Sequence, residues 1–590
     1  MKRIMVIVLT LLSIFAYPVL ASTKASDIEP IVVVVTGSLL PAMEEETPAV
    51  VQTIPPEVVQ AAEDLPQLLA DHVGIDLHAN RPTPGGVATL RIWGSTPTQV
   101  LVLLDGVPLN TPWDGMVDLS LLPLDAVERI EVQKGGSSSL YGNAAVGGVV
   151  NIITKKGFKP QNEVQVAAGS YNEKELAVTT AGPVDEVTYY RLNVGTDSGE
   201  GPQEHSAYRH NTLFASLDRD LSEYATASFT ILGYDADVQI PPIPWGPGEQ
   251  GNQRFRLTGH YSYEDLTGLT WKGALWLDSD HLTYETETEQ SDHRLATLGY
   301  SLIRSKSDED GGISLATDGL VTRVNSTNVV GQKTITNQGI FAEKTGQLAD
   351  WNYSVSGRLD LHSNFGLHLS PRLGFSRPLS GGTFKVNLGS SFKAPTANDL
   401  YWESTYGSGN PNLSPERAWS LEAQYLRVRS SWEWSVAAFY RYVQDMIAWP
   451  YDETAGKWVA QNIDEMKVKG TELSASRTLG KTLKLTGNLT LLSAEGAAVA
   501  VNPLAPVEYS LGLCYTPSTR LRTDLKLRGA GQRYNGVAAY TVVDSSVAYT
   551  LNPQTRLTLS ITNLMNEEYQ LNEGYTMPGR RIQAGVTYSF

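Results

Sequence analysis

The segment LKLTGNLTLL, residues 483–492, indicates how most of this 590-residue chain folds. Its leucines, at 483, 485, 489 and 491, alternate with the polar side chains of Lys484, Thr486, Asn488 and Thr490. Successive side chains of a β-strand point to opposite faces, so such a strand has one apolar face and one polar face. The segment therefore predicts a strand whose two faces lie in different environments.

The same alternation returns between residue 158 and the C-terminus, for example at 557, 559 and 561 and at every second position from 582 to 590. Strands of this kind form transmembrane barrels, with one face on lipid and the other on a polar lumen. A soluble β-sandwich alternates in the same way, but rarely over so many strands. Tight turns and longer irregular stretches, such as 239–252 and 402–412, separate the strands, as in outer-membrane barrels.

The N-terminus has the features of a secretion signal. Lys2 and Arg3 precede an apolar core at 4–16, and the small-residue site VLA at 19–21 predicts cleavage after Ala21. A membrane anchor is the alternative, but a spanning helix needs about 20 apolar residues. No later stretch reaches that length, and a secreted membrane chain without such helices crosses the membrane as a closed barrel.

The composition argues against two classes of function, nucleic-acid binding and catalysis. The chain holds 52 Gly, 27 Tyr and 12 Trp, which is typical of a turn-rich β-protein, and its formal net charge is −17. This charge argues against binding to the phosphate backbone of nucleic acids. The single cysteine, Cys514, cannot form an internal disulfide. The nine histidines form no metalloprotease pair and no catalytic motif is present, so we expect a protein that is not an enzyme.

The block before residue 158 has a different pattern. A short helix is expected at 63–73, because acidic residues and Pro66 lie in its first turn and Gly74 ends it. Strands are expected at 89–92, 100–104, 126–133 and 149–154. Near the start, the β-branched run at 29–38 (EPIVVVVTGS) suits strand addition to another protein, with an ordinary first strand of this block as the alternative. The pattern predicts a small mixed α/β domain.

Several motifs carry a resemblance to a known family. They are LVLLDGVPLN (101–110), LYGNAAVGGVVNIITKK (140–156), FKAPT (392–396), NPNLSPE (410–416) and NLMNEEY (563–569). Together they resemble the TonB-dependent outer-membrane receptors. The resemblance implies a monomeric antiparallel barrel of about 22 strands at 158–590, a plug domain at 45–157 that fills the lumen, a periplasmic segment at 22–44 and a signal peptide at 1–21. It also implies active import across the outer membrane, driven by the TonB energy-coupling complex.

The resemblance also implies site residues. The TonB box corresponds to Ile31, Val32, Val33, Val34, Val35 and Thr36. The ligand site lies at the plug apices, 78–86 and 110–118, with His78, Asn80, Arg81, Thr83, Gly85, Gly86, Asn110, Thr111, Trp113 and Asp114. Trp113 can pack on a flat face of the ligand or under its own loop, and the sequence fits both.

Within the family the similarity is greatest to receptors that import cobalamin, with ferric siderophores and then haem as alternative ligands. Haem receptors of this family carry a histidine between the FRAP-like and NPNL-like motifs, and residues 397–409 contain none; His78 is the feature that favours haem. Arg81 is the only basic residue of the two apices, which argues against an anionic siderophore. A large, nearly neutral cobalamin fits better.

The resemblance also bears on calcium binding and on the contact between plug and barrel. Cobalamin receptors use calcium, for which Asp197, Asp235 and Asp237 supply hard oxygen ligands; solvated loop carboxylates are the alternative. The family's two plug arginines are replaced by Trp93 and Lys134, so the contact between plug and barrel must differ, with Lys134 or Arg91 as substitutes.

Overall fold

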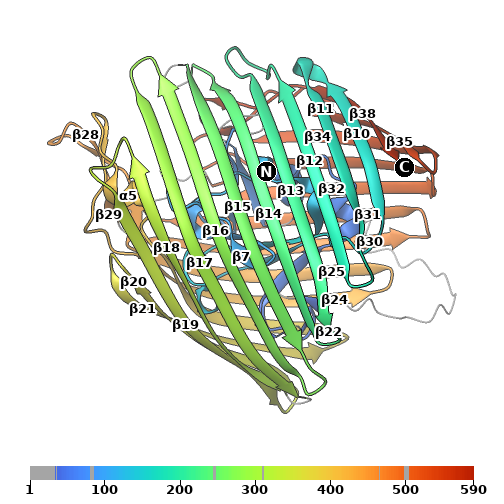
Figure 1. Ribbon diagram of the computed structural model, residues 1–590, viewed down its shortest axis with the longest axis horizontal. Helices are drawn as coiled ribbons and strands as arrows, with labels where there is room; N and C mark the ends of the chain where they lie inside the picture. Colours follow the sequence, from blue (N-terminus) through green and yellow to red (C-terminus); the bar gives the residue numbers. More distant parts are fainter. Residues whose placement is uncertain are drawn as a thin grey trace.

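The computed structural model describes residues 33–34, 36–40, 42–72, 74–79, 86–242, 247–308, 311–463, 465–496 and 504–590. The signal peptide expected at 1–21 lies outside these residues. The described chain forms a closed antiparallel barrel of 22 strands around a small N-terminal domain (Figure 1). No helix among the described residues is long and apolar enough to cross a membrane.

The barrel strands follow one another around the wall in chain order. They are β10 (Gln161–Gly169), β11 (Lys174–Pro183), β12 (Thr188–Gly199), β13 (Tyr208–Ser222), β14 (Ala225–Ile240), β15 (Gly248–Glu264), β16 (Leu269–Thr286), β17 (Gln290–Asp308), β18 (Gly311–Ser326), β19 (Lys333–Leu348), β20 (Trp351–His362), β21 (Gly366–Leu379), β22 (Gly382–Lys393), β24 (Glu416–Arg429), β25 (Trp432–Gln444), β30 (Met466–Leu479), β31 (Leu483–Glu495), β32 (Val507–Ser518), β33 (Leu521–Ala530), β34 (Tyr540–Asn552), β35 (Thr555–Thr562) and β38 (Arg581–Ser589). The last strand pairs with the first, Val586 opposite Val166, so the sheet closes on itself.

The alternation at 483–492 has the predicted consequence. Thr490 on β31 is 2% exposed and its hydroxyl accepts a hydrogen bond from the Gly74 amide of the inner domain, whereas the next residue, Leu491, is 43% exposed on the outer face. The terminal residues Tyr588 and Phe590 are likewise exposed. An apolar outer face and a polar lumen are what a bilayer requires of a barrel.

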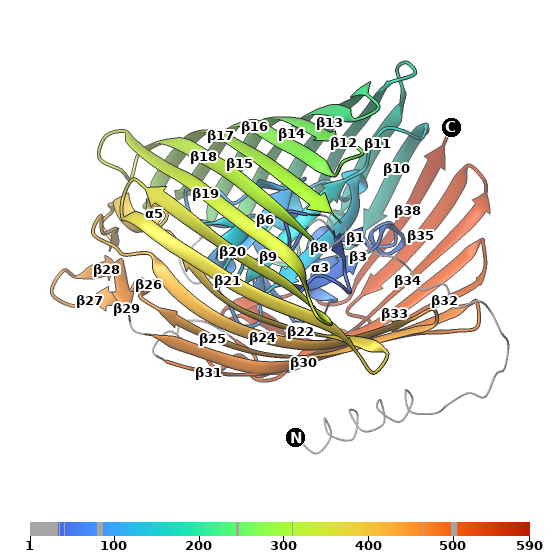
Figure 2. The ribbon, with the colours of Figure 1, turned by 90° about the horizontal axis from the view of Figure 1, so that it is seen from below.

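The two rims of the barrel differ. One rim has short turns, such as 223–224 and 349–350, and the other has long connections, above all 394–415 and 445–465. The long connections contain α5 (Ala397–Tyr401), β23 (Gly407–Ser408), β26 (Met446–Ala448), β27 (Tyr451–Asp452), β28 (Lys457–Val459), β29 (Gln461–Ile463), β36 (Gln570–Asn572) and β37 (Tyr575–Thr576), and the short 3-10 turn η4 (Ser170–Asn172) lies at the same rim. Short turns face the periplasm in outer-membrane barrels, so the rim with α5 and β28 faces outward (Figures 1 and 2).

The irregular stretch expected at 239–252 is shorter than predicted. Strand β14 continues to Ile240 and β15 already begins at Gly248, where Gly248 pairs with Ile240. Glycines and glutamines do not prevent pairing when both neighbouring strands supply hydrogen-bond partners, so the ladder extends through residues whose composition indicates a loop.

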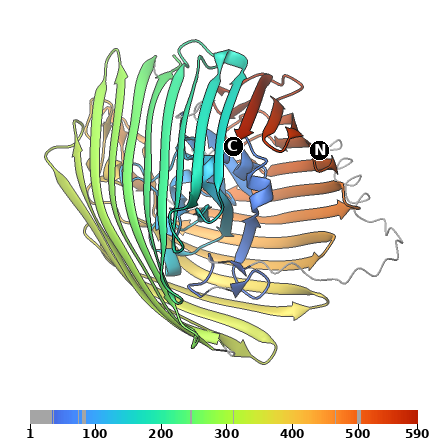
Figure 3. The same cartoon turned by 45° about the vertical axis from the view of Figure 1, so that its right-hand side comes forward.

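The N-terminal domain lies inside the ring of barrel strands (Figures 2 and 3). Its elements are β3 (Val50–Ile54), α2 (Pro56–Val59), α3 (Leu65–Ala70), β4 (Ile75–Ala79), β5 (Ala88–Ile92), η1 (Pro97–Gln99), β6 (Val100–Leu104), β7 (Val107–Pro108), η2 (Leu119–Leu121), η3 (Leu124–Ala126), β8 (Val127–Lys134), α4 (Ser138–Tyr141) and β9 (Gly148–Thr154), preceded by β1 (Val33–Val34) and β2 (Ala42–Met43). One sheet has the order β3-β8-β9-β6-β7, and β4 pairs with β5. The expected helix is α3, which Asp64 caps by accepting a hydrogen bond from the Gln67 amide.

Glu472 of β30 joins this plug to the wall. One of its carboxylate oxygens lies 2.7 Å from the Lys134 ammonium, and the other accepts a hydrogen bond of 2.5 Å from the Trp93 indole nitrogen. The Trp93 ring stacks on Phe439 of β25 at 4.4 Å, and the Arg441 guanidinium donates to the Trp93 carbonyl at 2.7 Å. Lys134 therefore does hold the plug against a barrel carboxylate, with an indole as the second donor.

Arg91, the other expected substitute, has a different role. It pairs with Asp76 of the plug at 3.3 Å, and the Arg533 guanidinium binds the same carboxylate at 2.8 and 2.9 Å. Arg91 thus acts inside the plug, and Arg533, from the connection after β33, makes the contact between barrel and plug.

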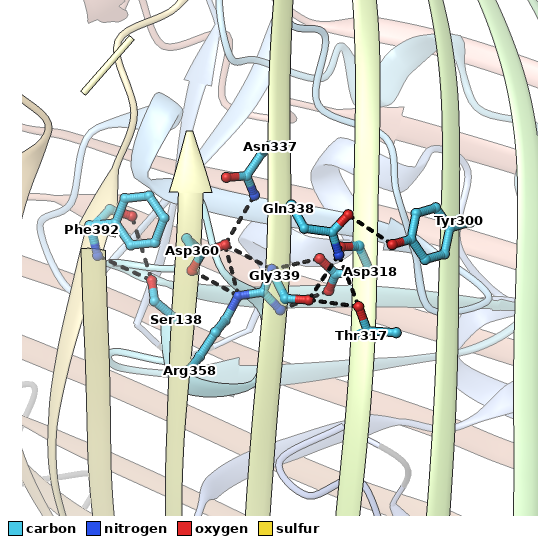
Figure 4. A network of polar contacts seen from close by, with 10 residues as sticks. All are labelled: Ser138, Tyr300, Thr317, Asp318, Asn337, Gln338, Gly339, Arg358, Asp360 and Phe392. Atoms are coloured by element: carbon cyan, nitrogen blue, oxygen red, sulfur yellow. Dashed lines mark hydrogen bonds and ion pairs between the residues drawn. The ribbon is translucent and has the colours of Figure 1, made fainter. Parts of the chain in front are cut away.

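A second buried network lies in the wall near the plug helix α4 (Figure 4). The Arg358 guanidinium donates to Asp318 at 2.6 and 2.7 Å and to Asp360 at 2.9–3.0 Å. A Cβ on Gly339 would lie 1.9 Å from an Arg358 nitrogen, so only glycine leaves room there. The network occupies the lumen face of β18–β20, where a cation must be paired because water is excluded.

We expect Glu472→Gln to destabilise the plugged barrel by about 3–5 kcal/mol, because Lys134 stays buried and loses its carboxylate partner. Urea unfolding in detergent, followed by tryptophan fluorescence, measures this change. The matched control is Glu495→Gln on the neighbouring strand, whose exposed pair with Lys469 spans 3.6 Å and contributes about 0–1 kcal/mol. Equal losses in the two variants would contradict the assignment of Glu472 as an anchor.

Candidate ligand-binding site

Residues 110–118 of the plug lie at the outward rim, beside α5 of the barrel. The Ala397 amide donates to the Pro112 carbonyl at 3.0 Å, and the Asn398 amide donates to the Trp113 carbonyl at 2.9 Å. The first turn of α5 therefore fixes this loop to the barrel. The structure thus places one of the two predicted plug apices at the outer mouth.

Asn110 determines the shape of the apex loop. Its side-chain oxygen accepts a hydrogen bond from the Val102 amide at 2.8 Å, and its amide nitrogen donates to the Val100 carbonyl at 3.0 Å and the Gly115 carbonyl at 2.9 Å. Thr111 acts in the same way, since its hydroxyl accepts from the Trp113 amide at 3.2 Å. Both side chains therefore fix the shape of the loop.

Trp113 packs under its loop. The side chain is 4% exposed, its ring stacks on His293 of β17 at 3.9 Å, and Trp402 after α5 lies 6.0 Å away. The ring also contacts an apolar cluster formed by the outer ends of β16–β19. The sequence allowed Trp113 either to contact the ligand or to pack under its own loop. In the structure it packs under the loop, because these neighbours cover the ring.

Asp114 stabilises its own loop, and Asp118 joins the two apex loops. The Asp114 carboxylate accepts from the Met116 amide at 3.0 Å, and Asp118 accepts from the Val87 and Ala88 amides, each at 3.0 Å. Val87 has a positive φ of 64°, which a β-branched residue adopts only under such constraint. Asp118 therefore connects the end of the other apex, which includes Gly86, to the loop at 110–118.

His78 lies inside the hairpin β4–β5 and contacts charged neighbours. Its Nδ1 lies 2.6 Å from an Arg91 nitrogen, and the Asn572 amide of β36 lies 3.2–3.3 Å from the ring. Burial, and then the neighbouring Arg91, lower the pKa of His78 well below its usual range, so the ring is neutral. The other predicted residues of this apex, Asn80, Arg81, Thr83 and Gly85, lie outside the described residues.

Several cations on the lumen face of the barrel are paired with carboxylates. Arg254 of β15 binds Asp278 at 2.9 Å and Asp280 at 3.3 Å, and its guanidinium also donates to the Leu109 carbonyl of the plug at 2.7 Å. Lys393 lies 3.3 Å from Glu416. These pairs at the outer half of the lumen position the plug and neutralise the wall around the mouth.

The three aspartates predicted to bind calcium do not come together. Asp197 faces the lumen and lies 2.8 Å from the imidazole of His210 on β13. His210 pairs in turn with Ala236 on β14. Asp235 and Asp237 flank Ala236 and therefore point to the outer face, where Asp237 pairs with Arg209 at 2.7 Å. No cluster of three metal-ligating side chains is present among the described residues. The three carboxylates do not form one ligand set in this structure.

Sequence reasoning missed the barrel half of the site. Arg254, Asp280, His293 and Trp402 surround the apex, yet they come from separate strands and loops. One signal was available, since charged residues such as those at 254, 256, 278 and 280 recur with period two inside strands and must face a polar lumen.

The end of the predicted TonB box is buried. Strand β1, Val33–Val34, pairs with β2, and the Thr36 amide donates to Glu131 of β8 at 2.8 Å. The Thr36 hydroxyl accepts from the Asn151 amide of β9 at 3.1 Å. Ile31, Val32 and Val35 lie outside the described residues.

A 22-strand barrel with a lumen-filling plug and an outward apex defines an outer-membrane receptor that imports its ligand. The chain belongs to the TonB-dependent receptors: the model of the TonB-dependent receptor plug domain matches residues 44–149, and that of the TonB-dependent receptor-like β-barrel matches 163–564. It is thus an outer-membrane protein of a family of transporters and receptors and not an enzyme.

Individual proteins are similar over most of their length. The vitamin B12 transporter BtuB of Vibrio cholerae is 26% identical over 597 residues, 95% of each chain. BtuB of Photobacterium profundum is 24% identical over 555 residues, 86% of this chain and 87% of the other. The crystal structure of the siderophore receptor PirA from Pseudomonas aeruginosa superposes with a TM-score of 0.77 at 21% identity, covering 92% of this chain and 99% of PirA. At that identity PirA shows the fold alone.

The stability of the apex should depend on pH through Asp114. Burial, with Asp280 and Asp399 nearby, raises the pKa of this carboxyl from 3.8 to about 7. Because the folded-state pKa lies above that of the unfolded chain, stability is lost as pH rises from about 4 toward 7. Asp114→Asn removes this loss, so its Tm advantage over the wild type should grow across that range and then level off. A Tm difference that does not change with pH would contradict the buried, protonated carboxyl.

Proposed function

We propose that this receptor imports cobalamin. Both BtuB relatives align over 86% or more of this chain and of their own length, so the similarity includes the plug, the barrel and their junction. The proposal extends the family assignment, which leaves the substrate open.

The charge pattern of the mouth supports a nearly neutral ligand, and this observation carries the proposal. Several cations among the described residues there have carboxylate partners: Arg254 with Asp278 and Asp280, Lys393 with Glu416, and in the outer connections Lys457 with Glu403. An anionic siderophore complex would have to compete with these carboxylates for each cation. Cobalamin, which is nearly neutral, would instead be bound through hydrogen bonds and apolar contact, and it would not have to displace these carboxylates.

Ferric siderophores remain the alternative ligand, and haem is the weaker one. Haem needs a histidine free to bind iron. His78 already contacts Arg91 and Asn572, and His293 lies under Trp113 with its Nδ1 2.7 Å from the Ser326 hydroxyl. Neither ring faces the mouth, so the feature that favoured haem in the sequence loses its support.

Import depends on TonB, and we propose residues 31–36 as the segment that TonB binds. A β-branched strand with few side-chain requirements suits addition to the edge of another sheet, in which backbone hydrogen bonds supply the affinity. The pairing of Val33–Val34 with β2 supports the view that this segment already takes part in a strand ladder.

The refolded protein should bind cyanocobalamin, and Asn110→Ala should weaken binding about tenfold or more, because the apex loop loses three hydrogen bonds that shape it. Equilibrium titration in detergent measures this. The matched control is Asn552→Ala, which removes the asparagine that accepts from the Gln554 amide in a turn at the opposite rim. Binding of ferric enterobactin without binding of cyanocobalamin would transfer the proposal to the siderophore alternative.

Val33→Pro should abolish energised uptake and leave cyanocobalamin binding unchanged, because proline removes a backbone donor and fixes φ in a strand that must pair. Val33→Ala is the control and should retain most uptake. Uptake of radiolabelled ligand by cells and binding to isolated outer membranes measure the two effects separately. If the proline variant still imports ligand, TonB binds elsewhere.

A further inference from the structure

A large cavity separates one side of the plug from the barrel wall. Its volume is about 1030 Å³, at the upper end of the range of small-molecule sites. The plug side consists mainly of α2, α3 and the segment between them, and the wall side of β10–β13 with β33–β35 and β38. The lining extends from Tyr171 and Met577 at the outward rim to Lys159 and Ser589 at the periplasmic rim. The cavity therefore spans the depth of the barrel.

The remaining circumference of the plug is attached to the wall. Arg358 of β20 and Glu422 of β24 lie on the side opposite the cavity, and Glu422 accepts from the Gly136 amide at 3.3 Å. Glu472 of β30 lies between that side and the cavity, three strands from β33. At Gly135 a Cβ would lie 2.2 Å from a Glu422 oxygen, so the plug backbone is in direct contact with the wall there. A solute could pass on that side only after these buried ionic contacts were broken. On the cavity side the ion pairs between plug and wall are more accessible: Lys526 with Asp71 and Lys156 with Asp218, whose lysine side chains are 38% and 33% exposed.

A ladder of polar side chains follows the wall of the cavity. Arg191, Asn193 and Asp197 share the lumen face of β12, and His210 of β13 is paired with Asp197 in the register. Strand geometry places Arg191 and Asp197 about 20 Å apart, a large part of the depth of a bilayer core. The ladder thus offers polar partners at successive depths.

Several atoms of this ladder are buried without a hydrogen-bond partner in the part of the chain that the structure describes. They are Nε and Nη1 of Arg191, Oδ1 of Asn193 and Nε2 of His210, on side chains that are 3–4% exposed. Buried polar atoms are normally paired, and these side chains line the cavity, so a small turn toward it would give their unpaired atoms partners among the polar molecules that fill it. Both donors and acceptors are present, which fits a nearly neutral solute rich in amide and hydroxyl groups.

We infer that this cavity is the route by which the ligand passes the plug, with Asp197–His210, Asn193 and Arg191 as successive hydrogen-bonding partners. The inference rests on the proposed import function but adds a location: the ligand leaves the apex toward β10–β13 and moves between this wall and the α2–α3 segment. The contacts at Glu472, Glu422 and Arg358 stay closed during transit.

Cysteine labelling tests the route without any ligand. In the full-length protein with Cys514→Ser, Ala177→Cys places a thiol on the cavity wall, and Ser356→Cys places one on the opposite wall, where the Ser356 hydroxyl lies 3.0 Å from Ser139 of the plug. Fluorescein maleimide added to intact cells should label Ala177→Cys and not Ser356→Cys. Equal labelling of both positions, or none at Ala177, would overturn the inference.

Transport of the labelled protein tests the function of the cavity. Uptake of cyanocobalamin and of ferric enterobactin by energised cells should fall about tenfold or more once Ala177→Cys carries the label, while surface binding stays unchanged. Labelled Leu192→Cys, on the outer face of β12, controls for the attachment itself and should import normally. Undiminished uptake through the labelled cavity would overturn the route. Binding of ferric enterobactin alone would refute the cobalamin proposal and leave the route to be judged from that probe.

Discussion

The plug stays in the barrel because charges buried between them must be paired. Lys134 and the Trp93 indole share the Glu472 carboxylate, and the plug glycines Gly74 and Gly135 lie so close to barrel carboxylates that an added Cβ would be 2.2 Å from an oxygen. This part of the interface is polar, whereas around Trp93 the plug also packs on apolar wall side chains such as Phe439 and Val468. Separating the plug from the wall therefore requires both that buried ionic contacts break and that apolar surface becomes exposed.

The barrel could be predicted from the sequence because the bilayer imposes a simple rule. Every wall residue faces lipid or lumen, and this rule is visible as period-two alternation, as at Thr490 and Leu491. The number of strands could not be derived in this way, since the alternation does not say where one strand ends. Strands β14 and β15 show why: pairing between neighbours continues to Ile240 and Gly248 through residues that resemble a loop.

The site was predictable only on the plug side. The segment at 110–118 was located from the family resemblance, but the roles within it depend on partners distant in sequence. Trp113 is covered because His293 and Trp402 meet it, and Asp197 is separated from Asp235 and Asp237 because the register of β12–β14 puts them on opposite faces. Register is fixed by the whole sheet, so a single segment does not reveal it.

Strand β8 connects the N-terminal segment, which we propose TonB binds, to the contact that anchors the plug in the wall. Glu131 of β8 binds the Thr36 amide, and three residues later Lys134 of the same strand binds Glu472. Beside them, Glu343 of the wall accepts hydrogen bonds from Ser38 and Leu39 at 2.9 and 2.8 Å. A pull on residues 33–34 therefore reaches β8 before it reaches α2 or α3. Since β8 is anchored at Lys134 on the side away from the cavity, force applied from the periplasm acts against a fixed edge of the plug, and the cavity lies along the other edge, beside β10–β13.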